Sequence, residues 1–235
     1  MLKIGKVVLN GAPKVVISFR DRVSSDVFRK IKSAGPDITE LRIDQYSSFE
    51  PSYVLNEVKK FSQFSSLVTI RSKKEGGAWN LSEQKRLELF RTVMPYVNAA
   101  DIELSSKKIL KEVVSCARKA KRLVCVSYHN FDKTPSAVQL AKILKDAKDA
   151  GADIVKIAVL ALKKEDVQLL ADFTLANRKQ NLVTISMGAK GVVSRIFFPA
   201  LGSLLTYTSL GSPVAPGQLD YATTVGLLRK LYPKN

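Results

Sequence analysis

A lysine in the middle of an apolar run is the residue of this sequence with the most evident chemistry. Lys156 lies in IVKIAV, a β-branched run typical of a buried strand. Burial disfavours the charged ammonium and exposes a neutral amine, which can attack a carbonyl carbon and form a Schiff base. An edge-strand or surface lysine is the alternative, and the apolar neighbours count against it. We therefore expect Lys156 to be a nucleophile.

The only histidine among the 235 residues, His129 in VSYHNFDKTP, suits the second half of such chemistry. A Schiff base acidifies the carbon next to the former carbonyl, and removal of that proton requires a base whose pKa is near neutrality. Histidine has such a pKa. A lone histidine is otherwise a core or surface residue. Because its predicted strand directly precedes that of Lys156, we expect His129 to be catalytic.

Short β-branched runs recur along the chain, and stretches with helical spacing of apolar residues separate them. Eight strands, each followed by a helix, are the components of an α/β fold of the (β/α)8 or TIM-barrel type. A doubly wound sheet is the alternative, and the even spacing favours closure. No linker interrupts residues 1–235, so we expect one barrel domain. The predicted strands are 15–19, 38–44, 66–72, 99–104, 122–129, 152–160, 181–188 and 204–210.

Charged residues fall on one face of five of these strands. Side chains two apart share a face, and the opposite, apolar face must pack against the helices. The charged face should therefore point into the barrel, toward the C-terminal strand ends where barrel active sites lie. Buried charges are costly unless they are paired, so an ion-pair network that merely fills the barrel is the alternative. Besides Lys156 and His129, the set comprises Glu40, Arg42, Asp44, Arg71, Asp101 and Glu103.

Other side chains could complete such a site. Glu103 lies on the strand before that of His129, where its carboxylate could bind the second imidazole nitrogen and fix the tautomer. Arg195, in SMGAKGVVSRI, could anchor a carboxylate. The loop SPVAPGQ ends at Gln218, a hydrogen-bonding tip, and the Gly-Gly pair in 73–80 (KKEGGAWN) suggests a flexible lid.

The charge of the chain is strongly positive. Thirty-eight Lys and Arg against 21 Asp and Glu give +17, which attracts anions such as acidic metabolites or nucleic acid. The lysines are scattered in pairs, without a long basic run, so most of them should lie on solvated helix faces. We expect no nucleic-acid partner, although an anion- or nucleic-acid-binding barrel without enzymatic activity stays open.

Several other features bear on compartment and cofactors. Cys116 and Cys125 have no metal-ligand spacing, and we expect reduced thiols in a cytoplasmic protein without a metal. No apolar run approaches the length of a membrane span, and we read no signal peptide at the N-terminus.

With these residues in place, the chain resembles the type I 3-dehydroquinate dehydratase family of the shikimate pathway. Short motifs carry the resemblance in the correct order across nearly the whole chain: GAPKVVISF, ELRID, TIRSKKEGG, DIEL, VSYHNFDKTP, VKIAV, SMGAKGVVSRI and APGQ. The resemblance implies a (β/α)8 barrel that needs no metal or organic cofactor. It also implies syn elimination of water from 3-dehydroquinate to give 3-dehydroshikimate, in an enzyme that is often a homodimer.

The resemblance also implies roles for individual residues. Lys156 matches the Schiff-base lysine, His129 the general acid/base and Glu103 the acid that orients the histidine. The positions that match substrate contacts are Ser18, Glu40, Arg42, Arg71, Met187, Arg195 and Gln218.

One position departs from the family pattern, because Val214 replaces the usual serine of the lid. We expect weaker binding through the lid, by about 1 kcal/mol for one hydrogen bond. The residues leave one further function open, a Schiff-base aldolase that acts on a phosphorylated sugar and needs a phosphate site after the last two strands.

Overall fold

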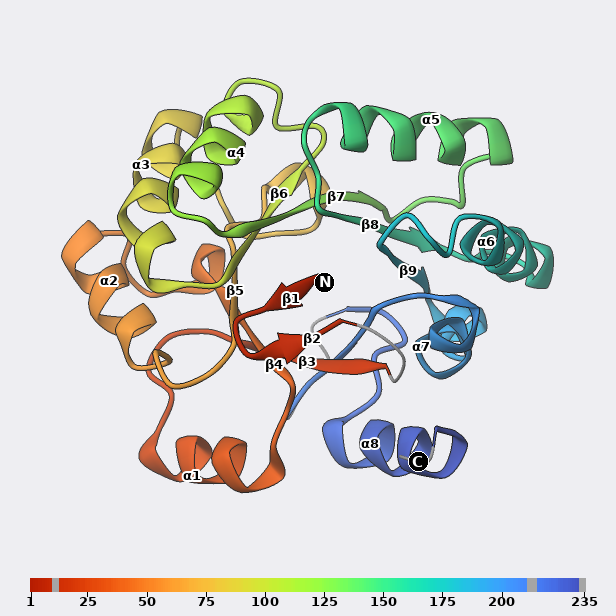
Figure 1. The fold of residues 1–235 in the computed structure, drawn as a ribbon, viewed down its shortest axis with the longest axis horizontal. Coiled ribbons are helices and arrows are strands. Elements are labelled where there is room, and N and C mark those ends of the chain that lie inside the picture. The colour runs from red at the N-terminus through yellow and green to blue at the C-terminus, as the bar shows by residue number, and fades with distance from the viewer. Residues whose placement is uncertain (10–12, 211–214, 233–235) are drawn as a thin grey trace.

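The structure is a computed structural model, and it describes residues 1–9, 13–210 and 215–232 (Figure 1). Within these residues eight parallel strands pair in the order β10-β3-β4-β5-β6-β7-β8-β9. Between β9 and β10 the backbone contact is one hydrogen bond from Leu204 N to Leu182 O at 2.8 Å, so the barrel is nearly closed. The strands are β3 (Lys14–Phe19), β4 (Ile38–Arg42), β5 (Ser66–Thr69), β6 (Ala99–Glu103), β7 (Leu123–Asn130), β8 (Ile154–Leu160), β9 (Leu182–Met187) and β10 (Leu205–Thr208). Each overlaps one predicted strand, and the predicted TIM-barrel class is confirmed.

Helices surround the strands on the outside of the barrel (Figure 1). The α-helices are α1 (Ser25–Ala34), α2 (Pro51–Lys59), α3 (Glu83–Val93), α4 (Leu110–Lys119), α5 (Ala137–Asp149), α6 (Lys164–Ala176), α7 (Ser194–Phe197) and α8 (Tyr221–Leu231). Short 3-10 segments are η1 (Ile43–Gln45), η2 (Lys73–Glu75), η3 (Met94–Tyr96), η4 (Ala189–Gly191) and η5 (Phe198–Leu201). The helical connection after β9 therefore consists of three short pieces, η4, α7 and η5, instead of one long helix.

Local capping explains where the helices begin. Ser82 accepts a hydrogen bond from the backbone N–H of Lys85 at the start of α3, and Ser136 forms a capping box with Gln139 at the start of α5. Gly35 ends α1 in the left-handed conformation, with φ of 68°. These are helix boundaries that the residue types predict.

The apolar face of the strands packs against the helices. Leu41, Ile102 and Ile157 are fully buried on this outer face, together with Val58 of α2 and Leu140 of α5. This burial is the main source of stability in such a fold, and it leaves the opposite face of each strand inside the barrel.

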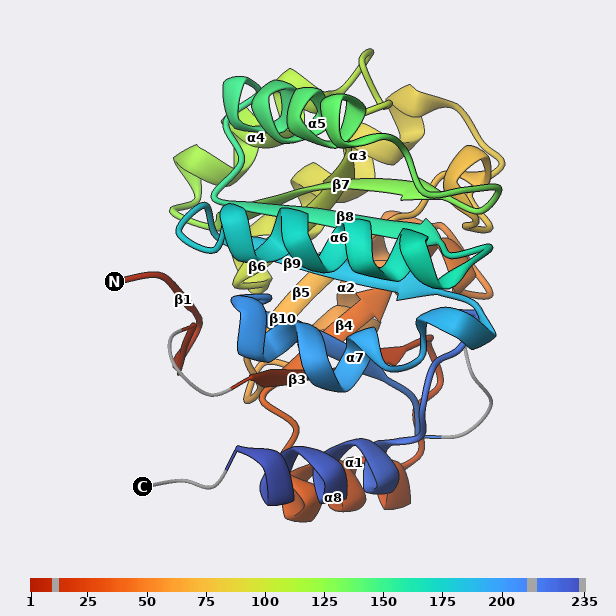
Figure 2. The same ribbon diagram turned by 90° about the vertical axis from the view of Figure 1, so that its right-hand side faces the viewer.

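The N-terminal end of the barrel interior is apolar and capped. Strands β1 (Lys3–Ile4) and β2 (Val7–Val8) form a hairpin, which Figure 2 shows at the end opposite the strand arrowheads. Ile4 and Leu9 are buried against inward residues such as Leu67 and Ile154. The sequence reading missed this hairpin, because strands of two residues show no periodicity.

Candidate active site

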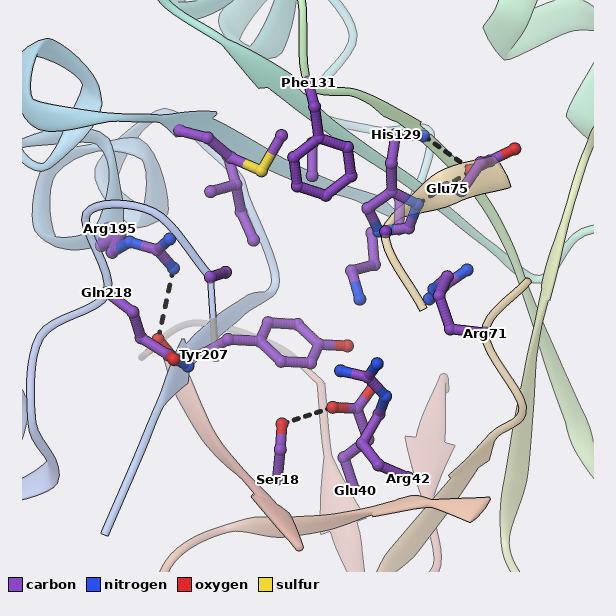
Figure 3. Close-up of a pocket in the computed structure, with 16 residues that line it drawn as sticks. Ser18, Glu40, Arg42, Arg71, Glu75, His129, Phe131, Arg195, Tyr207 and Gln218 are labelled. Carbon is purple, nitrogen blue, oxygen red and sulfur yellow. Dashed lines mark hydrogen bonds and ion pairs between the residues drawn. The ribbon is translucent and has the colours of Figure 1, made fainter. Parts of the chain in front are cut away.

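A cavity opens at the C-terminal end of the barrel, and nearly all predicted site residues line it (Figure 3). The predicted residues that line it are Ser18, Glu40, Arg42, Arg71, His129, Lys156, Met187, Arg195 and Gln218. The structure therefore brings nine of the ten predicted site residues together around one cavity, and their roles stay predictions. Glu103 is the one predicted site residue outside the lining.

Lys156 lines the cavity from β8. Its side chain is only 7% exposed, and Nζ donates a hydrogen bond to Asp101 Oδ2 at 3.3 Å. The ammonium lies 4.0 Å from the centroid of the Tyr207 ring, in a cation–π contact. The buried amine of Lys156 therefore contacts one carboxylate and one aromatic ring face at the edge of the cavity.

Asp101 and Arg71 link the lysine to the rest of the barrel. Arg71 Nη2 lies 2.9 Å from Asp101 Oδ1, and Ser127 Oγ donates to the same Asp101 oxygen at 2.6 Å. Burial alone raises the pKa of Asp101, but the charges of Arg71 and Lys156 outweigh burial and hold it well below its ordinary value. Asp101 is therefore a permanent negative charge beneath the amine.

His129 lines the same cavity from β7, which pairs with the strand of Lys156. Ser127 pairs with Lys156 and His129 with Ala158 in the β7–β8 ladder, so both functional side chains share the inner face. Burial, and then the positive charges of Arg71 and Lys156, lower the pKa of His129 well below its ordinary value. The imidazole is therefore neutral near pH 7, as a proton acceptor must be.

The acid that holds His129 is Glu75 rather than Glu103. Glu75 Oε2 accepts the backbone N–H of His129 at 2.9 Å and lies 3.0 Å from Nδ1 of the ring. Ser105 Oγ donates to the other Glu75 oxygen. Because Oε2 already accepts one N–H, Nδ1–H is the natural second donor, and this tautomer leaves Nε2 with its lone pair.

Glu103 has a different set of partners, so its predicted role beside His129 is wrong. Its carboxylate lies 3.2 Å from Arg71, contacts Arg86 and accepts the backbone N–H of Ser72 at 2.8 Å. Arg86 is itself fully buried on α3 and binds the Ile70 carbonyl oxygen at 2.7 Å. Glu103 thus ties the strand ends to a helix, below the cavity.

Strand parity could not find Glu75, because the residue lies on η2, beyond the end of β5. The signal that could have found it is the Gly-Gly pair after it. A Cβ on Gly77 would lie 2.1 Å from the Arg71 carbonyl oxygen, and one on Gly76 would lie 2.5 Å from the Phe131 ring. The pair therefore lies in a close-packed turn directly after Glu75, at the place where the sequence suggests a flexible lid.

Burial raises the pKa of Glu75 to about 7, and the nearby charge of Glu103 adds to the effect. Hydrogen bonds from Ser105 and His129 oppose the shift. The acid that orients His129 therefore changes its charge near neutral pH, which has consequences for the pH dependence of any proton transfer here.

On the side of the cavity across from His129, carboxylate and guanidinium groups are held in fixed orientations. Glu40 accepts hydrogen bonds from Ser18 Oγ and, at 2.8 Å, from Thr69 Oγ1. Arg42 makes a bidentate pair with Asp44, at 3.0 Å from Nε and 2.8 Å from Nη2. These groups suit recognition of a ligand with several hydroxyls, because their rotamers are set before binding.

Arg195 lies on a different side of the cavity from Glu40 and Arg42, and its guanidinium donates to backbone oxygens (Figure 3). Its guanidinium donates to the carbonyl oxygens of Gly217, Pro216 and Tyr207 at 2.8, 3.1 and 3.4 Å. Burial without a compensating carboxylate lowers its pKa to about 10. A buried cation with only neutral partners among the described residues is a site for an anionic group.

Gln218, which follows β10 in the chain, lies at the cavity beside Arg195 (Figure 3). Met187, the last residue of β9, also lines the cavity. Val214 lies outside the described residues, so the expected effect of its departure from the family pattern stays a prediction. Lining residues that the sequence reading did not name are Glu75, Gly76, Phe131, Ala158, Ile185, Tyr207 and Ala215.

Among the described residues no group of three or more His, Cys, Asp or Glu could hold a metal ion. Within the same residues, no helix is long and apolar enough to span a bilayer.

Comparison with known proteins agrees with the site. A family model described as Type I 3-dehydroquinase matches residues 15–234. The 3-dehydroquinate dehydratase of Methanococcoides burtonii is 36% identical over 226 residues, which cover 93% of this chain and 94% of that protein.

Two solved structures extend the agreement to the fold. The 3-dehydroquinate dehydratase of Aquifex aeolicus has a TM-score of 0.84 and 34% identity, covering 94% of this chain and all of that one. The type I enzyme of Clostridium difficile, solved with covalently modified comenic acid, has a TM-score of 0.89 and 28% identity, covering 97% and 96%. The chain therefore belongs to the type I 3-dehydroquinase family.

Proposed function

We propose that this protein is a 3-dehydroquinate dehydratase that eliminates water from 3-dehydroquinate through a Schiff base on Lys156. The observation that carries the proposal is the placement of Lys156 and His129 on adjacent strands, both facing one cavity. Family membership supports the same reaction. The Clostridium difficile relative was solved with a covalently modified ligand, which is consistent with a nucleophile in this family.

The first step joins the amine of Lys156 to the ketone carbon of the substrate. The ammonium gives up a proton, the amine attacks, and the carbonyl oxygen leaves as water, which produces a protonated imine. The positive charge of the protonated imine then lies on the same nitrogen that carried the charge of the ammonium. Asp101, at 3.3 Å from Nζ, and the face of Tyr207 stabilise that charge in both states.

The second step moves a proton from the carbon beside the imine. His129 accepts it through Nε2, since Glu75 holds Nδ1. The electron pair of the broken C–H bond forms the new C=C bond, and the leaving hydroxyl departs with the proton that His129 returns. Hydrolysis of the imine then restores Lys156, so one base serves each proton transfer.

Substrate recognition divides between the two walls of the cavity. Arg195 binds the carboxylate, because it is a buried cation whose described partners are neutral. Glu40, Arg42 and Arg71 bind ring hydroxyls, with Ser18 beside Glu40. Gln218 makes a lid contact and Met187 packs beside the imine, as the family resemblance implies.

The same proposal covers the wider setting of the enzyme. It requires no metal or organic cofactor, because the imine supplies the electron sink. The shikimate pathway, a homodimer and a cytoplasmic location follow from the family resemblance and from the composition, and they are part of the proposal on that basis.

An absorbance assay tests the reaction class. With 3-dehydroquinate, the enzyme should produce the absorbance of a conjugated enone. The Schiff-base aldolase is the rival, and it shares only the fold: a deoxyribose phosphate aldolase of Aeropyrum pernix is 14% identical, with a TM-score of 0.58. Cleavage of a sugar phosphate without enone formation would overturn the proposal.

A further inference from the structure

Tyr207 lines the cavity and carries a buried hydroxyl that has no hydrogen-bond partner among the described residues. The residue lies on the inner face of β10 and is 6% exposed, and its ring covers the ammonium of Lys156 at 4.0 Å. In the part of the chain that the structure describes, its hydroxyl is buried without a hydrogen bond. Buried hydroxyls normally find a partner, so an orphaned one at a binding cavity calls for an explanation.

The direction of the side chain indicates what the missing partner is. In Figure 3 the Tyr207 ring projects across the cavity, with its hydroxyl toward Glu40 and Arg42. Those two groups already have partners, since Glu40 accepts from Ser18 and Thr69, and Arg42 is paired with Asp44. The hydroxyl thus stands among groups suited to binding ligand hydroxyls, with its own hydrogen bond still to be made.

The hydroxyl is also in the right protonation state to donate. Burial, and then the negative charge of Glu40, raise the pKa of Tyr207 well above its ordinary value, so the phenol keeps its proton at any physiological pH. A neutral phenol can donate one hydrogen bond and accept another. An alcohol of the substrate is the matching group, because it too can do both.

We propose that Tyr207 determines substrate specificity, through a hydrogen bond between its hydroxyl and a ring hydroxyl that the substrate retains through the reaction. This inference rests on the proposed function. A ketone that lacks that hydroxyl would leave the buried phenol without a partner, and the site would discriminate against it. Phenylalanine at this position would supply the same ring to Lys156 without this selection.

The test is Tyr207→Phe, which removes one oxygen and keeps the ring over Lys156. For 3-dehydroquinate, we expect KM to rise about fivefold to tenfold, the effect of one lost hydrogen bond, and kcat to change less. The melting temperature should stay level or rise, because the hydroxyl makes no hydrogen bond to the described residues of the free protein. A purely structural role would lower the melting temperature and leave KM alone.

Substrate analogues that each lack one retained ring hydroxyl locate the contact. For the analogue that lacks the partner of Tyr207, wild type and Tyr207→Phe should have the same kcat/KM. For the other analogues the variant should keep its defect. An equal defect with every analogue would overturn the assignment.

Tyr46 offers a matched control. Its hydroxyl is likewise buried without a hydrogen bond among the described residues, but it lies in the outer core and does not line the cavity. Tyr46→Phe should leave KM for 3-dehydroquinate and the analogue preferences unchanged. A KM shift as large as that of Tyr207→Phe would contradict the inference.

The two proposals fail in different ways. If wild type turns over 3-dehydroquinate and Tyr207→Phe has the same KM, the role of Tyr207 is wrong and the function stands. If wild type neither turns over nor binds 3-dehydroquinate, the proposed function is wrong and the role of Tyr207 falls with it.

Discussion

The two ends of the barrel interior are built from the same strands and yet differ in almost every physical respect. At the N-terminal end Leu67 and Ile154 pack under a hairpin and are essentially unexposed. Two residues further along their strands, on the same face, stand Thr69 and Lys156, in a network of hydrogen bonds and ion pairs. The apolar end gains stability from burial, whereas the charged end must offset desolvation with paired partners.

This difference teaches that residues two apart on one strand can serve separate purposes. Paired charges by themselves do not identify a functional site, because Glu103 and Arg86 form a buried ion pair away from the cavity lining. The charged end differs from such a network in that Lys156, His129 and Arg195 all face an open cavity. Variants at the two ends should therefore separate activity from stability.

The largest effect should come from Lys156→Met. We expect kcat to fall at least about 10⁴-fold, because no imine can form. The fold should survive, since Asp101 keeps its bonds to Arg71 and Ser127. Steady-state turnover and thermal melting measure the two effects.

Ile154→Ala on the same face is the matched variant for the other end. It should cost about 2–5 kcal/mol of unfolding free energy by leaving a cavity, and the folded fraction should keep its kcat. If Ile154→Ala reduced kcat as much as Lys156→Met does, the division of the barrel into two ends would be wrong.

The next effect should come from His129→Ala. Dehydration should fall about 10²- to 10⁴-fold, because the base is absent, while the imine still forms more slowly. Single-turnover experiments that follow borohydride-trapped adduct and enone separately will distinguish the steps. Turnover close to that of wild type would rule out proton transfer by His129.

A smaller effect, with a pH signature, should come from Glu75→Gln. The pKa of Glu75 is about 7, and only its carboxylate form offers a negative charge to the imidazolium that His129 becomes when it takes a proton, so kcat/KM of wild type should rise as pH increases through about 7. The variant should lose roughly 10²-fold in kcat and lose this acid limb. A profile of kcat/KM against pH for both proteins provides the measurement.

The ionisation of Glu75 should affect stability with the opposite sign, so that stability falls where kcat/KM rises. Because the folded pKa of Glu75 is raised from 4.5, folding binds protons between pH 4.5 and about 7, and the free energy of unfolding falls as pH rises through that window.

Glu103→Gln is the contrasting variant: it should cost about 3–5 kcal/mol of stability by removing the fully buried carboxylate that pairs with Arg86 and Arg71, yet keep the acid limb. An acid limb lost in Glu103→Gln and kept in Glu75→Gln would restore the sequence-based assignment.

Much of this arrangement could be predicted from the sequence. Strand alternation placed Lys156, His129 and Glu40 on the inner face, because a period of two is strict wherever the other face is buried. That rule ends where the strand ends. Glu75 lies on η2, so no periodicity applied to it, and Glu103 on a strand took its place in the prediction.

Tyr207 was not predicted as a site residue, for a different reason. It lies in the run LLTYTSL, where an aromatic residue is typical of an ordinary strand. Only the structure shows its ring against Lys156 and its hydroxyl without a hydrogen bond in the part of the chain that is described. The N-terminal hairpin was not predicted because each of its strands has only two residues. Contacts between segments far apart in the chain decided the cases of Glu75 and Tyr207.

Borohydride reduction in the presence of 3-dehydroquinate, followed by peptide mass spectrometry, tests the central claim most directly. Reduction would make an imine permanent, so the peptide that contains Lys156 should gain the mass of the reduced ligand. Lys156→Met should gain nothing under the same conditions. An active enzyme that gives no adduct, or one whose adduct lies on another lysine, would contradict the account.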